Sequence, residues 1–155
     1  MLYLSCIALD ILGRMLLLKA GEYKQFVDKR RKNFERLYQG LKEVQDKLIL
    51  PAAQQDSNPS WFGFMMTCRE GIGREKVVPY IEDHGVQTRM LFAGNLIKHP
   101  CFDEIRGDKT KYRIAGTLEN TDRIMKDTFW VGVYPGMTDE MIDYMIRIIK
   151  EAVMQ

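Results

Sequence analysis

Hydrophobic and polar positions repeat with two different periods along this chain, and the changes of period divide it into elements. Over residues 22–48, apolar side chains recur mostly at steps of three and four residues, which is the spacing of one face of an α-helix. The basic run 29–32 is balanced by neighbouring acids, and this balance favours a solvated helix surface over a phosphate site. Pro51 is predicted to end the helical region, and residues 54–59 to form a polar loop.

Short runs of aromatic, apolar and β-branched residues predict three strands. The first is 60–68, where Gly63 stands between two phenylalanines and indicates either a bulge or a place of close approach to the backbone. The second opens the stretch 85–95, whose Gly-Asn pair is typical of a turn. That stretch is either an ordinary strand and surface loop, or a turn that presents polar groups to an anion or a sugar. The third strand is 128–134.

The segments between and after these strands carry helix signals of unequal strength. Residues 74–84 read as a helix, but a proline inside a helix costs about 3 kcal/mol, so Pro79 predicts that it is short or bent. Residues 99–118 are expected to be irregular. The run 119–122 is predicted to cap a short helix, and Thr138 to begin a final amphipathic helix.

Together these elements predict one α+β fold, a small antiparallel sheet with helices packed on one face. Trp61, Phe92 and Trp130 are expected in the core of this fold.

The first twenty residues are apolar enough to raise the question of a signal peptide or a membrane span. Asp10 and Arg14 interrupt the apolar run, and a span needs about 20 mainly apolar residues. We therefore expect a helix that packs on the rest of the chain or on a partner subunit, and no membrane partner.

Composition narrows the class of protein. The chain has 155 residues and a net charge of +2 from 23 basic and 21 acidic residues, which leaves no electrostatic footprint for nucleic acid. Three widely spaced cysteines without a CxxC pair predict reduced thiols in a cytoplasmic protein.

The residues alone do not identify an enzyme. A metal site from His84, His99 and Cys101 is conceivable, but their spacing matches no known ligand pattern, and we predict no metal site. Dinucleotide-binding, P-loop and nucleophile-elbow motifs are all lacking from the sequence.

Four segments in order carry a family resemblance. They are KRRKNFERLYQGL (29–41), PSWFGFMMTCRE (59–70), VQTRMLFAGNLIKHPCF (86–102) and NTDRIMKDTFWVGVYPGMTDEMIDYMI (120–146). The chain resembles the C-terminal small domain of the DegT/DnrJ/StrS family of sugar-aminotransferase-like enzymes. Within that family it is most similar to the CDP-4-keto-6-deoxyglucose 3-dehydratases of lipopolysaccharide sugar synthesis. The resemblance covers residues 22–155; residues 1–21 and Pro79 depart from it.

This resemblance implies a fold-type-I, pyridoxal-phosphate-type architecture of which the chain is the smaller part. Residues 1–21 would be the remnant of a helix that links to an absent large domain, and 22–155 the small domain. The whole enzyme would use pyridoxamine or pyridoxal 5′-phosphate to remove the C3 hydroxyl of a CDP-hexose. It would form a homodimer and work with a reductase partner. The chain alone is expected to be inactive, without catalytic residues or a cofactor of its own.

The resemblance also implies three site residues. Phe62 falls where sugar aminotransferases of the family usually have histidine, and it is expected to face the cofactor. Arg89 and Asn95 lie on the family's active-site loop and are expected to bind the phosphates and hydroxyls of the nucleotide sugar. Two alternatives remain open: a stand-alone α+β binding or assembly module, and the domain of a sugar aminotransferase.

Overall fold

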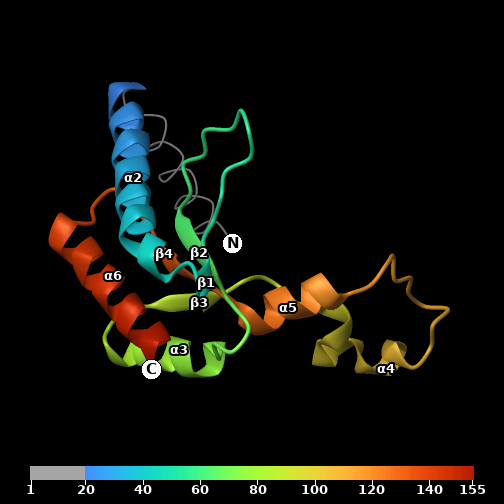
Figure 1. Ribbon diagram of the computed structural model, residues 1–155. Helices are drawn as coiled ribbons and strands as arrows, with labels where there is room; N and C mark the ends of the chain where they lie inside the picture. The colour runs from blue at the N-terminus through green and yellow to red at the C-terminus, as the bar shows by residue number, and fades with distance from the viewer. Residues whose placement is uncertain (1–19) are drawn as a thin grey trace, which may run out of the picture.

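The computed structural model describes residues 20–155, and the side chains from residue 22 onward (Figure 1). The helix expected over the first twenty residues lies outside the described part. Four helices form the body and the arm described below: α2 (Ala20–Leu41), α3 (Arg74–Asp83), α5 (Glu119–Asp127) and α6 (Asp139–Met154). The shorter helical turns are η1 (Lys42–Val44), η2 (Leu96–Lys98), η3 (Pro100–Phe102) and α4 (Asp103–Arg106).

The sheet has four antiparallel strands in the order β1-β2-β4-β3. Their bounds are β1 (Leu48–Ile49), β2 (Gly63–Cys68), β3 (Thr88–Met90) and β4 (Thr128–Gly132). The central strands pair from Gly63 to Thr67 of β2 along all of β4, with Met65 opposite Trp130 and Phe64 opposite Val131. The predicted small antiparallel sheet with helices is therefore confirmed.

The two faces of the sheet differ in how far they are buried. Successive side chains of a strand point to opposite faces, so Phe64 and Met66 share one face while Met65 lies on the other. The first face is covered by α2, α3 and α6, and together they form one core (Figure 1). Its largest fully buried side chains are Phe64, Phe129, Leu37, Leu41, Leu48, Met66, Ile81, Ile142, Ile148 and Ile149. The second face carries Met65, which is 41% exposed, and is here called the open face.

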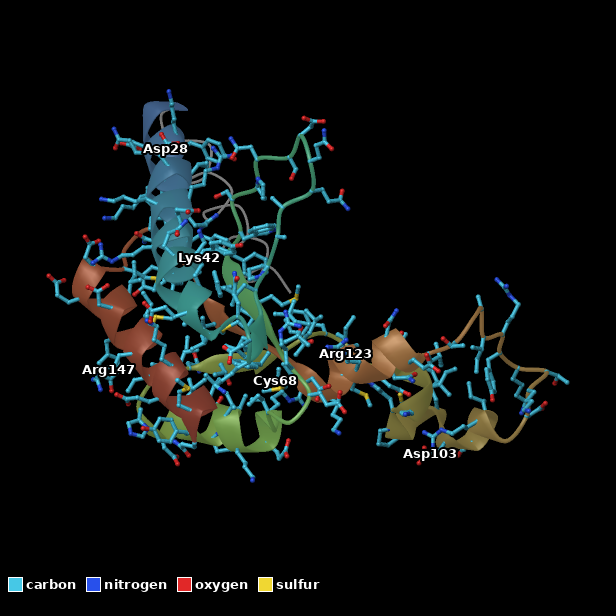
Figure 2. All side chains as sticks on the ribbon, viewed as in Figure 1. Asp28, Lys42, Cys68, Asp103, Arg123 and Arg147 are labelled. Carbon is cyan, nitrogen blue, oxygen red and sulfur yellow. The ribbon has the colours of Figure 1, made fainter. Side chains whose placement is uncertain are left out.

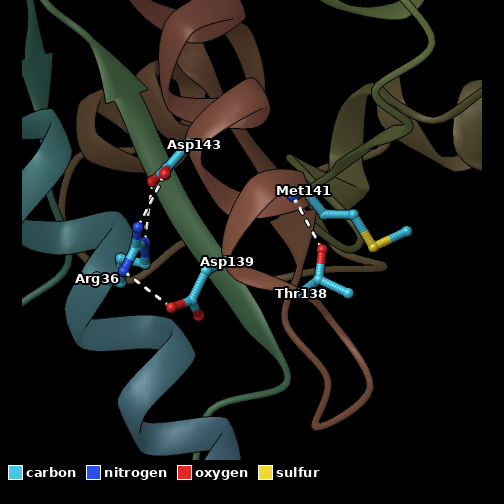
Figure 3. Close-up of polar contacts among 5 residues, drawn as sticks. All are labelled: Arg36, Thr138, Asp139, Met141 and Asp143. Carbon is cyan, nitrogen blue, oxygen red and sulfur yellow. Dashed lines mark hydrogen bonds and ion pairs between the residues drawn. The ribbon is translucent and has the colours of Figure 1, made fainter.

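Helices α2 and α6 lie side by side and are joined by ion pairs at their exposed edge (Figure 3). The guanidinium of Arg36 donates to both carboxylate oxygens of Asp143, at 2.9 and 2.8 Å, and to Asp139 at 3.2 Å. This two-pronged geometry fixes the orientation of the two helices better than a single contact would. The Thr138 hydroxyl accepts from the amide of Met141 at 3.2 Å, which confirms Thr138 as the cap of α6.

Residues 91–127 leave the body as an arm that carries η2, η3, α4 and α5. Figure 1 shows this arm extending away from the helices that cover the core. Figure 2 shows Asp103 and Arg123 on the arm, apart from Lys42 and Arg147 on the body. The arm returns to the sheet through α5, which runs directly into β4.

Several boundaries differ from the sequence prediction. The predicted helix over 22–48 is wrong at its end, because the chain leaves α2 at Leu41 and Leu48 pairs with Cys68 as strand β1. A strand of two residues is too short to show a hydrophobic period in the sequence. It forms only because β2 offers it a partner. The strand expected over 128–134 ends at Gly132, while α3 is a 10-residue helix that keeps Pro79 exposed on its surface.

The predicted capping run 119–122 is also wrong. Helix α5 already begins at Glu119 after Leu118, and no side chain caps it. The amide of Asp122 donates to the Leu118 carbonyl, so Asp122 lies inside the helix. Its carboxylate is used elsewhere, as described below.

The two faces of β2 give a matched test of the core. Met66→Ala removes a fully buried side chain and should cost about 2–5 kcal/mol of the free energy of unfolding. Met65→Ala, the same change one residue earlier on the open face, should cost less than about 1 kcal/mol. Urea unfolding of the two variants measures the difference, and equal losses would contradict a sheet that is buried on one face.

Candidate functional site

The open face of the sheet holds an aromatic cluster centred on Trp130. The rings of Trp130 and Phe62 meet edge to face, with centroids 5.5 Å apart and planes at 89°. Phe92 also meets this indole edge to face, with centroids 6.2 Å apart and planes at 77°. Phe62 is 65% exposed and Phe92 76% exposed, so the cluster is a surface that a planar or apolar group can contact.

Gly63 lies directly beneath the indole. A Cβ atom added to Gly63 would stand 2.6 Å from Cε3 of Trp130, closer than real Cβ contacts allow. The sequence left open a bulge or a close approach at Gly63. Its regular pairing with Gly132 shows that close approach is the reason for the glycine. The indole nitrogen donates to the carbonyl of Met90 at 3.3 Å, which ties the ring to the edge strand β3.

Phe62 stands immediately before β2. Its carbonyl accepts from the amide of Val133 at 2.7 Å, so the backbone pairing of β2 with β4 continues for one residue beyond the start of β2. The side chain contacts the indole of Trp130, and the two rings suit one wall of a site for a flat ring or a sugar face.

Arg89 lies on the same open face, opposite Trp130 in the pairing of β3 with β4. Its side chain is exposed, and Nη1 donates to the carbonyl of Thr88 at 2.8 Å. The guanidinium lines a hollow with Glu82 and Gln87, and its positive charge on the open face is the chemistry that an anionic ligand requires.

Asn95 is placed differently from Phe62 and Arg89. It is 2% exposed, and both ends of its amide are used within the chain. Nδ2 donates to Oδ1 of Asp122 at 2.8 Å, while Oδ1 accepts from the amide of Ile97 at 3.2 Å. These bonds make Asn95 an anchor of the loop 91–98, and its predicted contact with substrate stays a prediction.

The anchor continues into α5. Lys98 contacts the same oxygen of Asp122 at 2.8 Å, and the hydrogen bonds from Lys98 and then Asn95 lower the pKa of that carboxyl. Gly94, with φ of 72°, lies against Met125, where an added Cβ would stand 2.7 Å from Cγ. Phe92 is thus carried by a loop that is fixed on both α5 and the sheet.

Sequence reasoning predicted Phe62 and Arg89 at one site; Phe62 contacts the ring of Trp130 and Arg89 pairs with Trp130 in the sheet, while their contact with a ligand stays a prediction. It missed the aromatic surface of Phe92 and Trp130, which it assigned to the core; Phe92 is mostly exposed and Trp130 half-buried. Strand alternation could have placed Trp130 correctly. Side chains of a strand alternate between its two faces, and the neighbours Phe129 and Val131 are fully buried, so Trp130 between them lies on the opposite face.

The cysteines and histidines contribute no second site in the described residues. Burial raises the pKa of the Cys68 thiol to about 11, so the thiol stays protonated, and Cys101 is an exposed free thiol. Imidazole nitrogens of His84 and His99 contact the carbonyls of Tyr80 and Ala93. Across 20–155, no three His, Cys, Asp or Glu side chains are grouped so as to hold a metal ion.

Comparison with known proteins identifies the family. The model of the DegT/DnrJ/EryC1/StrS aminotransferase family matches residues 10–150. The chain belongs to this family. The match extends the resemblance seen in the sequence towards the N-terminus.

Two curated relatives share a large part of the sequence. The lipopolysaccharide biosynthesis protein RfbH of Salmonella typhimurium is 45% identical over 83% of this chain. The dTDP-4-dehydro-2,6-dideoxy-D-glucose 3-dehydratase of Saccharopolyspora spinosa is 42% identical over 93% of it. The chain spans 29% and 30% of the lengths of these two proteins.

Solved structures show the same fold. The GDP-4-keto-6-deoxy-D-mannose-3-dehydratase of E. coli, solved with bound hydrated PLP, matches 83% of the chain with a TM-score of 0.69 at 24% identity. An aminotransferase from Psychrobacter cryohalolentis matches 94% with a TM-score of 0.73 at 18% identity. The chain covers 32% and 38% of these structures, so the fold is that of a part of such enzymes. Within the described residues, no helix has the length and apolarity needed to cross a bilayer.

The Asn95–Asp122 anchor predicts a pH-dependent contribution to stability. A carboxylate whose pKa is lowered by folding stabilises the fold above its unfolded pKa of about 3.9, and this contribution is lost as the pH falls through the folded value. Asp122→Asn should therefore lower the urea midpoint at neutral pH, and the difference from wild type should vanish in acid. Glu119→Gln removes an exposed carboxylate from the same first turn of α5 and serves as the control. Equal effects of both variants at neutral pH would show that the anchor adds nothing specific.

Proposed function

We propose that this chain is the C-terminal small domain of a nucleotide-sugar 3-dehydratase that uses pyridoxamine phosphate. The observation that carries the proposal is the identity of 42–45% with two proteins, one named a 3-dehydratase and one a lipopolysaccharide biosynthesis protein. Solved aminotransferases match the fold equally well but are less than 25% identical, so they support the architecture and not the reaction.

The open face suits a supporting part in that reaction. When bound, pyridoxamine phosphate supplies an amine for the 4-keto carbon of the sugar and an aromatic ring that accepts electrons. The exposed ring of Phe62 gives that assembly an apolar wall, and a wall of this kind excludes water from the reacting atoms. Arg89, on the same face, is suited to a phosphate of the nucleotide sugar. Asn95 holds the loop 91–98, which follows Arg89 and carries Phe92.

The remaining features of the proposal concern the whole enzyme. Its substrate is a CDP-4-keto-6-deoxyhexose, its active form a homodimer, and its product passes to a reductase, all in the cytoplasm. The large domain supplies the partners of the cofactor's phosphate and ring nitrogen. An alternative is a stand-alone binding or assembly module with the same fold, and the two are distinguished by whether a separate or fused large domain restores dehydration.

Phe62 gives a test of dehydratase against aminotransferase chemistry. In the full-length enzyme, Phe62→His places a proton-transferring imidazole on the wall, and we expect the products to shift from dehydration towards amino transfer when an amino-acid donor is present. Phe62→Tyr keeps the ring without an imidazole and is the control. Product analysis by mass spectrometry measures the ratio. Amino transfer by the unmodified enzyme would instead assign the family's aminotransferase activity to it.

The chain by itself should not hold the cofactor. The exposed wall provides contact on one side only, so titration of the 155-residue chain with pyridoxamine or pyridoxal phosphate should give no stoichiometric change in cofactor absorbance. The full-length enzyme is the positive control. Stoichiometric binding by the chain would contradict the proposal that the cofactor site belongs mainly to the large domain.

A further inference from the structure

The indole of Trp130 is only half-buried, yet residues of several elements contact it. Gly63 removes the Cβ beneath it, the Met90 carbonyl accepts from its nitrogen, and Phe62 and Phe92 meet it edge to face. These contacts come from β2, β3 and the loop that follows β3. A side chain whose rotamer is fixed from several elements is suited to orienting another group.

A glycine at position 63, inside strand β2, is unfavourable for the stability of the strand. Glycine in a strand loses more conformational freedom on folding than alanine and offers no side chain to pack. Gly63 has no positive φ to explain its presence, and the paired Gly132 has open space around an added Cβ. The indole above Gly63 is therefore the physical reason for this glycine.

Phe62 depends on that indole. Its side chain is 65% exposed and stands just before β2 begins, so little of it is restrained by burial. The edge-to-face contact with Trp130 selects one orientation of the exposed ring from those open to it. Phe92 also contacts the indole edge to face, from a loop that Asn95 and Asp122 anchor.

We propose that Trp130, seated on Gly63, is a positioning residue that sets the orientation of Phe62 in the active site. This inference rests on the proposed function for its catalytic consequence, but the contact itself can be tested without activity. Trp130 acts through Phe62 and is not itself placed against the reacting atoms.

The test compares Gly63→Ala with Gly132→Ala. Both variants add one methyl group at paired positions of β2 and β4, but only the first meets the indole. The chain has two tryptophans, so Trp61→Phe leaves Trp130 as its sole reporter. In that background, the emission of the 155-residue chain should move to longer wavelength with Gly63→Ala and stay unchanged with Gly132→Ala.

Kinetics of the full-length enzyme then connect the contact to function. Gly63→Ala should lower kcat about tenfold to a hundredfold, as expected for a misplaced site group, with a smaller change in KM. Trp130→Phe, which adds no atoms, should change kcat in the same direction. In a Phe62→Leu background, the effect of Gly63→Ala should largely disappear, because the group being positioned is already gone.

Each outcome decides a separate point. Equal emission and equal kcat for the two alanine variants would overturn the positioning role. An undiminished loss of kcat from Gly63→Ala in the Phe62→Leu background would show that Trp130 does not act through Phe62. If the unmodified full-length enzyme does not dehydrate a nucleotide sugar, the proposed function fails, while the emission comparison still decides whether Gly63 seats the indole.

Discussion

The pairing of β2 with β4 is the contact on which the rest of this fold depends. These two central strands come from distant parts of the chain, and their pairing turns Phe64, Met66, Phe129 and Val131 to one face. Helices α2, α3 and α6 gain their stability by covering that face, since an amphipathic helix is held mainly by the apolar surface that it buries. The short edge strands β1 and β3 form only because this pair gives them a backbone to join.

The same pairing creates the candidate site. When alternate side chains build the core, the residues between them are carried to the opposite face, and there Met65, Trp130 and Arg89 lie in one row across the sheet. The core therefore fixes the geometry of the open face with no separate scaffold. This coupling explains how an exposed ring such as Phe62 can be held by a small domain: its support is the rigid centre of the sheet.

The arm adds a second constraint to this surface. Asn95 and Asp122 fasten the loop 91–98 to α5, and α5 continues directly into β4. A group of exposed aromatic side chains beside a charged residue is typical of a binding surface and unusual on the outside of a complete monomer. The chain spans about three-tenths of the length of its curated relatives. Under the function proposed above, this surface would meet the remainder of the enzyme or its substrate.

Periodicity and residue type were sufficient for much of this description. They predicted the long helix, the central strands, the last helix with its cap at Thr138 and the α+β class, because each depends on local spacing. The family followed from long ordered motifs such as TRMLFAGN and FWVGVYPGMT. Tertiary structure decided what spacing cannot express: that Leu48 joins the sheet, that Asp122 holds Asn95, and that Phe92 and Trp130 lie on the open face. The physical reason is that each of these depends on a partner distant in the chain, and only the folded sheet places Gly63 beneath Trp130.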